Sequence, residues 1–408
     1  MAASQCISRL GAWEGYEIDH DEEVRRAGVI WCVIHLRSVR RARHCCSGCG
    51  SWMRSVHDWQ ERRVRDLPIF GVPVELVVPR MRLLCPRCGP KLEQLSWLEP
   101  YARVTVRLAD SVARLCKLMS IRHVAQFYGL AWTTVKRIDK RHLERELGPV
   151  DLAGVHVIAM DEFAIHKGHR YATVIVEPYR KQVLWVGLGR GRADIRPFFE
   201  LLGAAGRAGL QAVAMDMNAG YAEEVRAQCP GAKIVYDLFH VVAKYGRQVI
   251  DRVRVDQANR LRGDKAARKL VKGARWLLAR NLSNVTRAQD LVRLRDLLKA
   301  NKALFTVYVM KDDLKTLWDY RHSGYAERFW KQWYGRAMRS RIEPLKAFAR
   351  NLKGYLPGIL SHCRWPLGTN LVEGINNKIK VIKRMAYGFR DDDYFFLKIR
   401  AAFPGDRR

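Results

Sequence analysis

The order of apolar runs and helical periods between residues 155 and 236 restricts the fold more than any other feature of this chain. Three apolar runs come first, at residues 155–160, 171–176 and 182–187. The segments between them are short, so these runs are predicted to form an antiparallel meander. Helix, strand, helix and strand are then predicted near residues 195–206, 211–215, 222–228 and 233–236. A sheet built in this order belongs to the α/β class.

Two of the predicted strands end in an aspartate. Asp161 follows the apolar run at residues 155–160, and Asp216 follows the strand predicted at residues 211–215. We expect both carboxylates to lie side by side at one edge of the sheet, in a domain of the ribonuclease H-like type. Cleavage of a phosphodiester commonly uses two divalent ions about 3.5–4 Å apart, clamped by carboxylates from separate elements. Such hard oxygen ligands favour Mg²⁺, or Mn²⁺ in its place.

A third acid, Glu373, lies on a predicted helix near the end of the chain. One face of this helix is apolar, with Val372, Ile375, Ile379, Ile382 and Ala386. The other face has Glu373, Asn377, Lys380 and Arg384. Two interpretations stay open from the spacing, because Asn370 and Glu373 also fit a helix-capping pair. The need for several carboxylates favours a metal-binding role with Asp161 and Asp216, and Lys380 is then expected to bind the phosphate near the cut.

Two Cys-x-x-Cys-Gly motifs precede this region. Their four cysteines are Cys46, Cys49, Cys85 and Cys88. Two such pairs suit a structural zinc ion with tetrahedral geometry, and a hairpin over residues 68–78 would connect them. Cys45 is an alternative to Cys46, and a redox pair is the alternative to zinc. Ten cysteines in 408 residues are too few for a disulfide scaffold.

Residues 120–138 are predicted to form helix, turn and helix, with Gly129 in the turn. The candidate DNA-contacting residues of the second helix are Trp132, Thr133, Lys136, Arg137 and Lys140. Ala131 stands where a Ser or Thr cap is usual, a loss of about 1 kcal/mol. An ordinary helical hairpin is the alternative interpretation.

The chain carries a formal net charge of +32, which favours a polyanionic partner over a small metabolite. Residues 251–370 contribute most of this charge, with 27 Lys and Arg against 10 Asp and Glu, and they are predicted to be helical. Five tryptophans are interleaved there: Trp276, Trp318, Trp330, Trp333 and Trp365. They could stack on bases, but a place in the helical core is favoured for each of them.

The predicted domains follow from these changes of pattern. They are a zinc-binding domain at residues 1–100, a helix-turn-helix domain at 101–148, and a catalytic domain at 149–408 with a helical insertion at about 245–365. No run reaches the roughly 20 apolar residues that span a bilayer, and no export signal is visible. A cytoplasmic protein is therefore expected, and a place on the nucleoid of a bacterium is implied only by the family resemblance that follows.

This organisation, and above all the segment of residues 372–390, resembles the ISL3 group of bacterial insertion-sequence transposases. The resemblance implies an acidic triad of the DDE type at Asp161, Asp216 and Glu373. It also matches an Asp-x-x-His element at Asp237 and His240, for which we expect a positioning role.

The function that this resemblance implies is binding to the terminal inverted repeats of a mobile element, followed by metal-dependent strand cleavage and strand transfer into target DNA. A homodimer or larger assembly would hold two DNA ends. Two alternatives stay open: a DNA-binding regulator with an inactive nuclease-like domain, and a ribonuclease H-like nuclease that cuts without specific end sequences.

Overall fold

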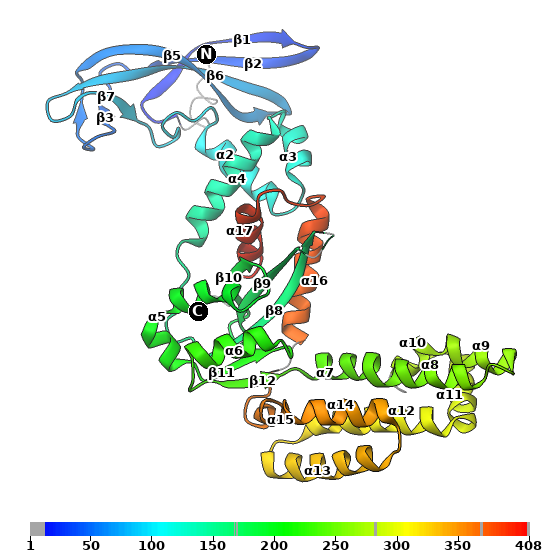
Figure 1. The fold of residues 1–408 in the computed structure, drawn as a ribbon. Coiled ribbons are helices and arrows are strands. Elements are labelled where there is room, and N and C mark those ends of the chain that lie inside the picture. Colours follow the sequence, from blue (N-terminus) through cyan, green and yellow to red (C-terminus); the bar gives the residue numbers. More distant parts are fainter. Residues whose placement is uncertain (1–12, 167, 169, 281–283, 368–369, 406–408) are drawn as a thin grey trace. The chain divides into compact units, whose positions relative to one another are not determined.

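A computed structural model describes residues 13–166, 168, 170–280, 284–367 and 370–405 (Figure 1). The chain divides into two compact units. The first unit comprises Met1–Gly148 and Lys383–Leu397, and the second comprises Pro149–Ile382 and Lys398–Arg408. Within the described residues, no helix is long and apolar enough to cross a membrane.

The first unit begins with seven strands that are paired antiparallel except for β2 and β6, which are parallel. These are β1 (Tyr16–Arg26), β2 (Val29–Ser38), β3 (His44–Cys46), β4 (Trp52–Met53), β5 (Val56–Ile69), β6 (Val72–Cys85) and β7 (Gly89–Gln94). The strand order is β1-β2-β6-β7-β3-β4, and β5 pairs with β6. Strands β5 and β6 form the predicted hairpin, whose two-residue turn has positive φ at Phe70 and Gly71. This hairpin connects the two cysteine pairs.

Three helices follow in the first unit. They are α2 (Val106–Cys116), α3 (Ile121–Tyr128) and α4 (Trp132–Leu147). Ser120 caps α3 by accepting a hydrogen bond from the His123 amide at 3.3 Å. Gly129 ends α3 in the left-handed conformation, and Val124 and Val135 are fully buried between the helices. Ala131 precedes α4 without a side-chain cap. The helix-turn-helix prediction is confirmed in each of these details.

The first unit also contains the end of α16 (Asn370–Met385) and the start of α17 (Asp392–Ala402). Tyr394 of α17 donates a hydrogen bond to the buried carboxylate of Asp139 on α4. A charged carboxylate in a helical core requires such a donor. Residues 383–397 therefore stabilise the helix-turn-helix, although the sequence indicated only a place at the end of the catalytic domain.

The second unit contains a mixed sheet in the predicted order. Its strands are β8 (Val157–His166), β9 (Arg170–Glu177), β10 (Gln182–Leu188), β11 (Ala212–Met215) and β12 (Lys233–Tyr236). The sheet order is β10-β9-β8-β11-β12. Strands β8 to β10 form the antiparallel meander, while β11 is parallel to both β8 and β12. The connecting helices are η1 (Ala193–Ile195), α5 (Arg196–Gly209) and α6 (Ala219–Gln228).

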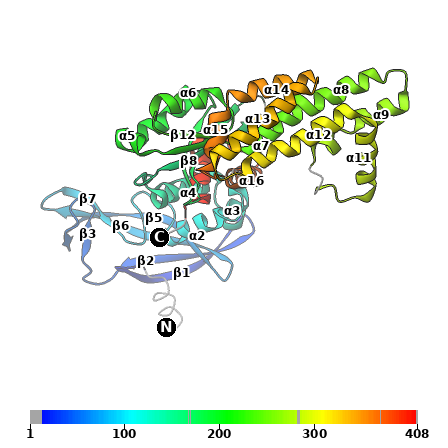
Figure 2. The ribbon, with the colours of Figure 1, turned by 90° about the horizontal axis from the view of Figure 1, so that it is seen from below.

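The predicted helical insertion follows β12. Its elements are α7 (Leu238–Tyr245), η2 (Gly246–Ile250), α8 (Asp251–Arg260), α9 (Lys265–Gly273), α10 (Arg275–Ala279), α11 (Ala288–Ala300), α12 (Lys302–Lys315), η4 (Thr316–Asp319), α13 (Ser323–Arg339), α14 (Glu343–Lys353), α15 (Leu356–Leu360) and η5 (Ser361–Cys363). Figure 2 shows these helices side by side, from α7 and α8 to α13 and α14.

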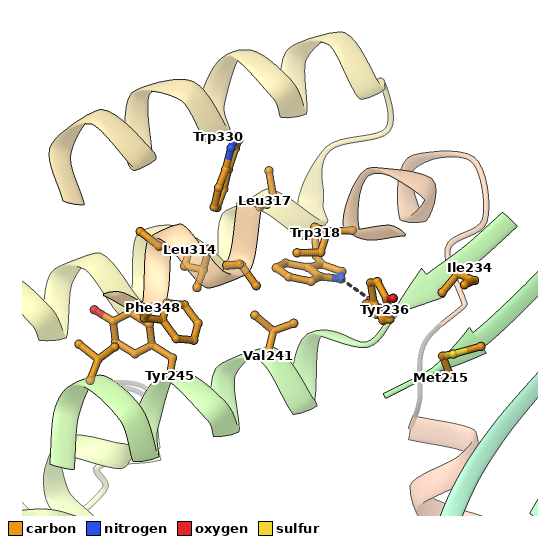
Figure 3. Close-up of a cluster of buried hydrophobic side chains, with 14 of the residues drawn as sticks. Met215, Ile234, Tyr236, Val241, Tyr245, Leu314, Leu317, Trp318, Trp330 and Phe348 are labelled. Atoms are coloured by element: carbon orange, nitrogen blue, oxygen red, sulfur yellow. Dashed lines mark hydrogen bonds between the residues drawn. The ribbon is translucent and has the colours of Figure 1, made fainter. Parts of the chain in front are cut away.

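One hydrophobic core runs from the sheet of the second unit into the insertion. Figure 3 shows Val241 and Tyr245 of α7 facing Leu314, Leu317 and Phe348. The Trp318 indole donates a hydrogen bond to the Tyr236 carbonyl oxygen of β12 at 3.4 Å. The insertion and the sheet therefore share one packed interior.

The tryptophans of the insertion differ in their exposure to solvent. Trp318, Trp330 and Trp333 are buried, at 8%, 3% and 1% exposed, as predicted, and Trp365 is half-buried. For Trp276 the prediction of a core position is wrong, because this side chain is 71% exposed. The short helix α10 presents its other face to the core, through Leu277 and Leu278.

Candidate active site and metal centre

Three aspartates occupy matching positions at neighbouring parallel strands of the second unit. Asp216 and Asp237 directly follow β11 and β12, but the prediction that the first strand ends at Asp161 is wrong, because β8 continues through this residue to His166. Ala159 of β8 pairs with Ala214 of β11, so the same register, continued by two residues, sets Asp216 opposite Asp161. Met215 of β11 pairs with Tyr236 of β12, which sets Asp237 beside Asp216. Neighbouring strands lie about 4.8 Å apart. The strand register thus forms a row of acids.

Asp161 is held by two hydrogen bonds. Its Oδ1 accepts from the backbone N–H of Glu162 at 2.8 Å, and its Oδ2 accepts from Nδ2 of Asn376 at 2.6 Å. Burial raises the pKa of Asp161 to about 6; the charge of Asp216 adds to this effect, and His240 acts against it. The carboxylate is therefore fixed in direction and costly to ionise without a cation.

Asp216 lies in the same electrostatic environment. Burial is the main cause that raises its pKa, the Glu162 carboxylate adds to it, and His240 and Lys244 act in the opposite direction. His240 thus lies close enough to influence both Asp161 and Asp216. Two half-buried acids with one histidine beside them form a site that attracts positive charge.

The Asp-x-x-His element begins helix α7 next to this pair. Oδ1 of Asp237 caps the helix by accepting from the Phe239 amide at 3.1 Å. Its Oδ2 is buried, lies 3.8 Å from Nε2 of His240, and has no hydrogen-bond partner among the described residues. Buried carboxylate oxygens are normally paired, so this oxygen is available to an added ligand or water.

Helix α16 has the two faces that its sequence predicts. Val372, Ile375 and Ile379 are buried, while Glu373 and Lys380 are exposed, as are Asn377 and Arg384. Lys380 donates a hydrogen bond to Oδ1 of Asn377 at 3.3 Å. The alternative capping role of Glu373 involves the Asn370 side chain, which lies outside the described residues.

Asn376 is a site residue that the sequence interpretation missed. It lies one helical turn after Glu373, at a spacing that leaves the two Cβ atoms about 5–6 Å apart. The side chain is only 8% exposed, and its Oδ1 has no hydrogen-bond partner among the described residues. The only sequence signal is a polar residue directly beside Ile375 in the apolar stripe.

The four predicted zinc ligands converge. The Sγ atoms of Cys46, Cys49, Cys85 and Cys88 all lie within 4.8 Å of one another. Sγ of Cys49 is 3.6 Å from Sγ of Cys85, close to the roughly 3.8 Å between two thiolates on tetrahedral zinc. Cys45 is not in this group, which decides between the two alternatives for the first pair. Among the described residues it is the single group of this compactness, so the three predicted Mg²⁺ ligands do not form one.

Glycines shape the two cysteine turns. Gly50 and Gly89, which end the two motifs, both have φ of +70°, a conformation that favours glycine. A Cβ on Gly48 would lie 3.0 Å from Sγ of Cys88. Hydrogen bonding to Ser51 is the main cause that lowers the pKa of Cys49 to about 6. A thiol that ionises readily is suited to a metal.

The predicted DNA-contacting residues of α4 differ in their surroundings. Trp132 is 50% exposed, and Thr133 and Arg137 are exposed. Lys136 and Lys140 instead form ion pairs with Asp391, at 2.8 and 3.2 Å. The sequence did not indicate this acid, because it is more than 250 residues away from both lysines.

Family models match almost the whole of this arrangement. Residues 42–88 match the zinc finger of transposases IS204/IS1001/IS1096/IS1165, residues 93–143 match the helix-turn-helix domain of transposase family ISL3, and residues 158–399 match the ISL3 transposase domain of the DDE type. The chain belongs to the ISL3 family of transposases. The predicted resemblance is confirmed, and with it a DNA-binding transposase with a zinc finger, a helix-turn-helix and a catalytic domain in that order.

Two relatives show how far the similarity extends. The chain is 53% identical over 411 residues to the transposase for insertion sequence element IS1001 of Bordetella parapertussis, with all of both chains covered. It is 28% identical over 417 residues to the transposase for IS1557 of Mycobacterium tuberculosis, covering 97% of this chain and 93% of the relative. Both matches include the zinc finger as well as the catalytic domain.

Proposed function

We propose that this ISL3 transposase binds the terminal inverted repeats of its insertion sequence and catalyses strand cleavage and strand transfer through Asp161, Asp216 and Glu373. The observation that carries the proposal is the hydrogen bond from Asn376 to Asp161. It joins the helix of Glu373 to the strand of Asp161, whose neighbour in register is Asp216. We assign the sheet and its flanking helices to the ribonuclease H-like type.

The acids fit a pair of Mg²⁺ or Mn²⁺ ions. All candidate ligand atoms are hard oxygens, which these cations prefer. The raised pKa of Asp161 and the unpartnered Oδ2 of Asp237 both indicate a site that lacks positive charge in the protein alone. When bound to Asp161, Asp216 and Glu373, two such ions would activate the attacking oxygen and stabilise the leaving oxygen.

The chain's own residues would position and bind. Asn376 fixes the direction of Asp161, while Asp237 and His240 support Asp216 from the start of α7. Lys380, about two turns beyond Glu373 on the same exposed face, is suited to a phosphate next to the scissile bond. Both reactions are in-line displacements by an oxygen, so no covalent link between protein and DNA is needed.

The other domains would select the DNA. The zinc ion has a structural role, because four thiolates close its coordination sphere. Trp132, Thr133 and Arg137 are exposed on α4 for contact with a major groove, and Lys136, Lys140 and Arg384 would bind phosphates. Joining two ends of one element to a target requires a homodimer or a larger assembly on double-stranded DNA.

Cleavage of a labelled inverted-repeat duplex in the presence of Mg²⁺ tests this proposal. Asp161→Asn, Asp216→Asn and Glu373→Gln should each lower cleavage at least a thousandfold and leave binding of the duplex unchanged. Glu200→Gln, an exposed substitution on α5, is the matched control and should cleave normally.

The remaining outcomes separate the alternatives. Normal cleavage by one of the three variants would remove that residue from the triad. Binding without cleavage by the unaltered protein would indicate a DNA-binding regulator, and cleavage irrespective of end sequence would indicate a nuclease.

A further inference from the structure

A pocket of about 260 Å³ opens beside the candidate active site. Helix α7 and the π-helical turn η2 form one wall, through Phe239, Ala243, Gly246 and Arg247, and α10 contributes Arg275 and Trp276. All these elements belong to the second unit. π-Helical turns inside longer helices often occur at functional sites, so the wall has the local geometry of a binding site.

The pocket combines exposed aromatic rings with basic groups. Phe239 is 57% exposed and Trp276 is 71% exposed. The Arg275 guanidinium lies 5.3 Å from the centre of the Trp276 ring. Arg275 pairs at 3.6 Å with Asp251, which also lines the pocket, whereas Arg247 is exposed and forms no ion pair within the described part of the chain. Large apolar rings exposed next to cations are typical of surfaces that bind single nucleic acid strands.

The helix that carries Trp276 is fixed by hydrogen bonds from a buried lysine. Lys311 of α12 is 1% exposed and donates hydrogen bonds to the carbonyl oxygens of Leu278 and Arg280, at 3.2 and 2.7 Å. These carbonyls end the short helix that carries Trp276, and such end groups require a donor. Lys311 also lines the pocket. The tryptophan therefore lies on a fixed element, although its ring is open to solvent.

Helix α7 belongs both to the pocket wall and to the candidate active site. The rings of Phe239 and His240 are adjacent, with their centres 5.5 Å apart and nearly perpendicular. Phe239 lines the pocket, whereas His240 influences the ionisation of Asp161 and Asp216.

We infer that this pocket binds one unpaired nucleobase of the DNA strand that enters the active site, by stacking on Trp276 with Arg247 and Arg275 near the adjacent phosphates. The inference rests on the proposed function. A volume of this size admits a single base and not stacked base pairs, and the excess of Lys and Arg in the insertion favours a polyanion. The base would be drawn out of the duplex beside the cut.

The test compares two short DNA duplexes that differ in one group. One carries a single unpaired adenosine nucleotide at a 3′ end, and in the other this nucleotide is abasic. Fluorescence anisotropy without added Mg²⁺ or Mn²⁺, so that no cleavage occurs, measures the Kd of the full-length protein for each. The unaltered protein should bind the base-containing duplex about tenfold more tightly, the usual effect of stacking one base on an aromatic ring.

Variants assign the effect to the pocket. Trp276→Ala should bind both duplexes equally, with the affinity that the unaltered protein has for the abasic duplex. Trp276→Phe should keep most of the preference, because it keeps a ring. Phe305→Ala, which removes a 50% exposed ring outside the pocket, is the matched control and should behave as the unaltered protein.

Two outcomes would overturn the inference. They are equal affinity of the unaltered protein for both duplexes, as expected if the pocket docks another protein, and an unchanged preference in Trp276→Ala. Failure of the proposed function appears separately, as absent Mg²⁺-dependent cleavage, while a retained base preference would still support the pocket.

Discussion

Asp161 is a half-buried carboxylate that must be ionised to bind a cation. Burial raises its pKa from 3.8 to about 6 in the protein alone, so the folded state holds a proton that the unfolded state releases. The ionised carboxylate therefore destabilises the fold, and this penalty grows as the pH rises from about 4 to 6 and stays constant above. Two pKa units correspond to roughly 3 kcal/mol.

Asp161→Asn should accordingly stabilise the metal-free protein while it abolishes cleavage. The Asn376 amide can turn so that its unpartnered Oδ1 accepts from the new amide, which preserves the contact. We expect a gain of up to about 3 kcal/mol at pH 7.5 without added Mg²⁺ or Mn²⁺, which disappears near pH 4. Urea unfolding at both pH values measures it, with the exposed Asp256→Asn as control. A gain that is independent of pH would contradict this account.

Helix α4 presents a basic face that is partly neutralised by its own chain. Asp391 pairs with Lys136 and Lys140, and its Oδ1 also caps α17 by accepting from the Tyr394 amide at 3.0 Å. Asparagine caps helices as well as aspartate does. Asp391→Asn therefore removes the charge and keeps the cap.

Asp391→Asn should increase the affinity for duplex DNA and its salt dependence. Two lysines freed for phosphates would steepen the slope of log K against log[salt] by up to about 1.8, since each phosphate contact contributes about 0.9. Anisotropy titrations at several NaCl concentrations measure the slope. The double variant Asp391→Asn with Lys136→Met should lose half of the increase in this slope. An unchanged slope in Asp391→Asn would exclude these lysines from the DNA interface.

In the zinc finger, a metal ion is expected to supply the stability that a large hydrophobic core supplies elsewhere. Its buried cluster contains only Cys46, Leu83 and Cys85, too little apolar surface to fold such a segment alone. Cys88→Ser, or removal of zinc by a chelator, should unfold residues 44–53 and 85–94 and leave α2 to α4 helical. Hydrogen exchange by mass spectrometry localises the change, with the non-ligand Cys45→Ser as control. Protected amides in zinc-free protein would refute the metal assignment.

Elements built from local patterns could be predicted from the sequence. The meander, the helix-turn-helix and the two faces of α16 follow from periodicity, and the strand register then aligns Asp216 with Asp161. Contacts between distant segments could not be predicted. In the sequence, Asn376 is a polar residue within an apolar stripe, and Asp391 is one of three consecutive acids. Neither pattern indicates the distant residue that each one contacts. Nothing in the spacing of the tryptophans distinguishes exposed Trp276 from buried Trp318, because burial depends on which face of a short helix meets the core.

The second unit should unfold in one cooperative transition. Its core continues from Ile158 and Met215 in the sheet to Trp333 and Phe348 in the insertion. A domain inserted through flexible linkers would have two separate cores and two transitions. Here the strand that ends at Tyr236 continues through Asp237 directly into α7, so His240, a residue of the candidate active site, lies on the first helix of the insertion.

Trp318→Ala tests this cooperativity. The indole contacts the end of β12 through its hydrogen bond to Tyr236, and its removal from the core should cost about 3–5 kcal/mol. Because sheet and insertion share one core, native-state hydrogen exchange should show the same loss of protection in β8 and β11 as in α12 and α14. Trp276→Ala, the same substitution at an exposed site, should change stability by less than about 0.5 kcal/mol. Loss of protection confined to the insertion would mean that the helices fold independently of the sheet, and His240 would then be attached to a separately mobile part.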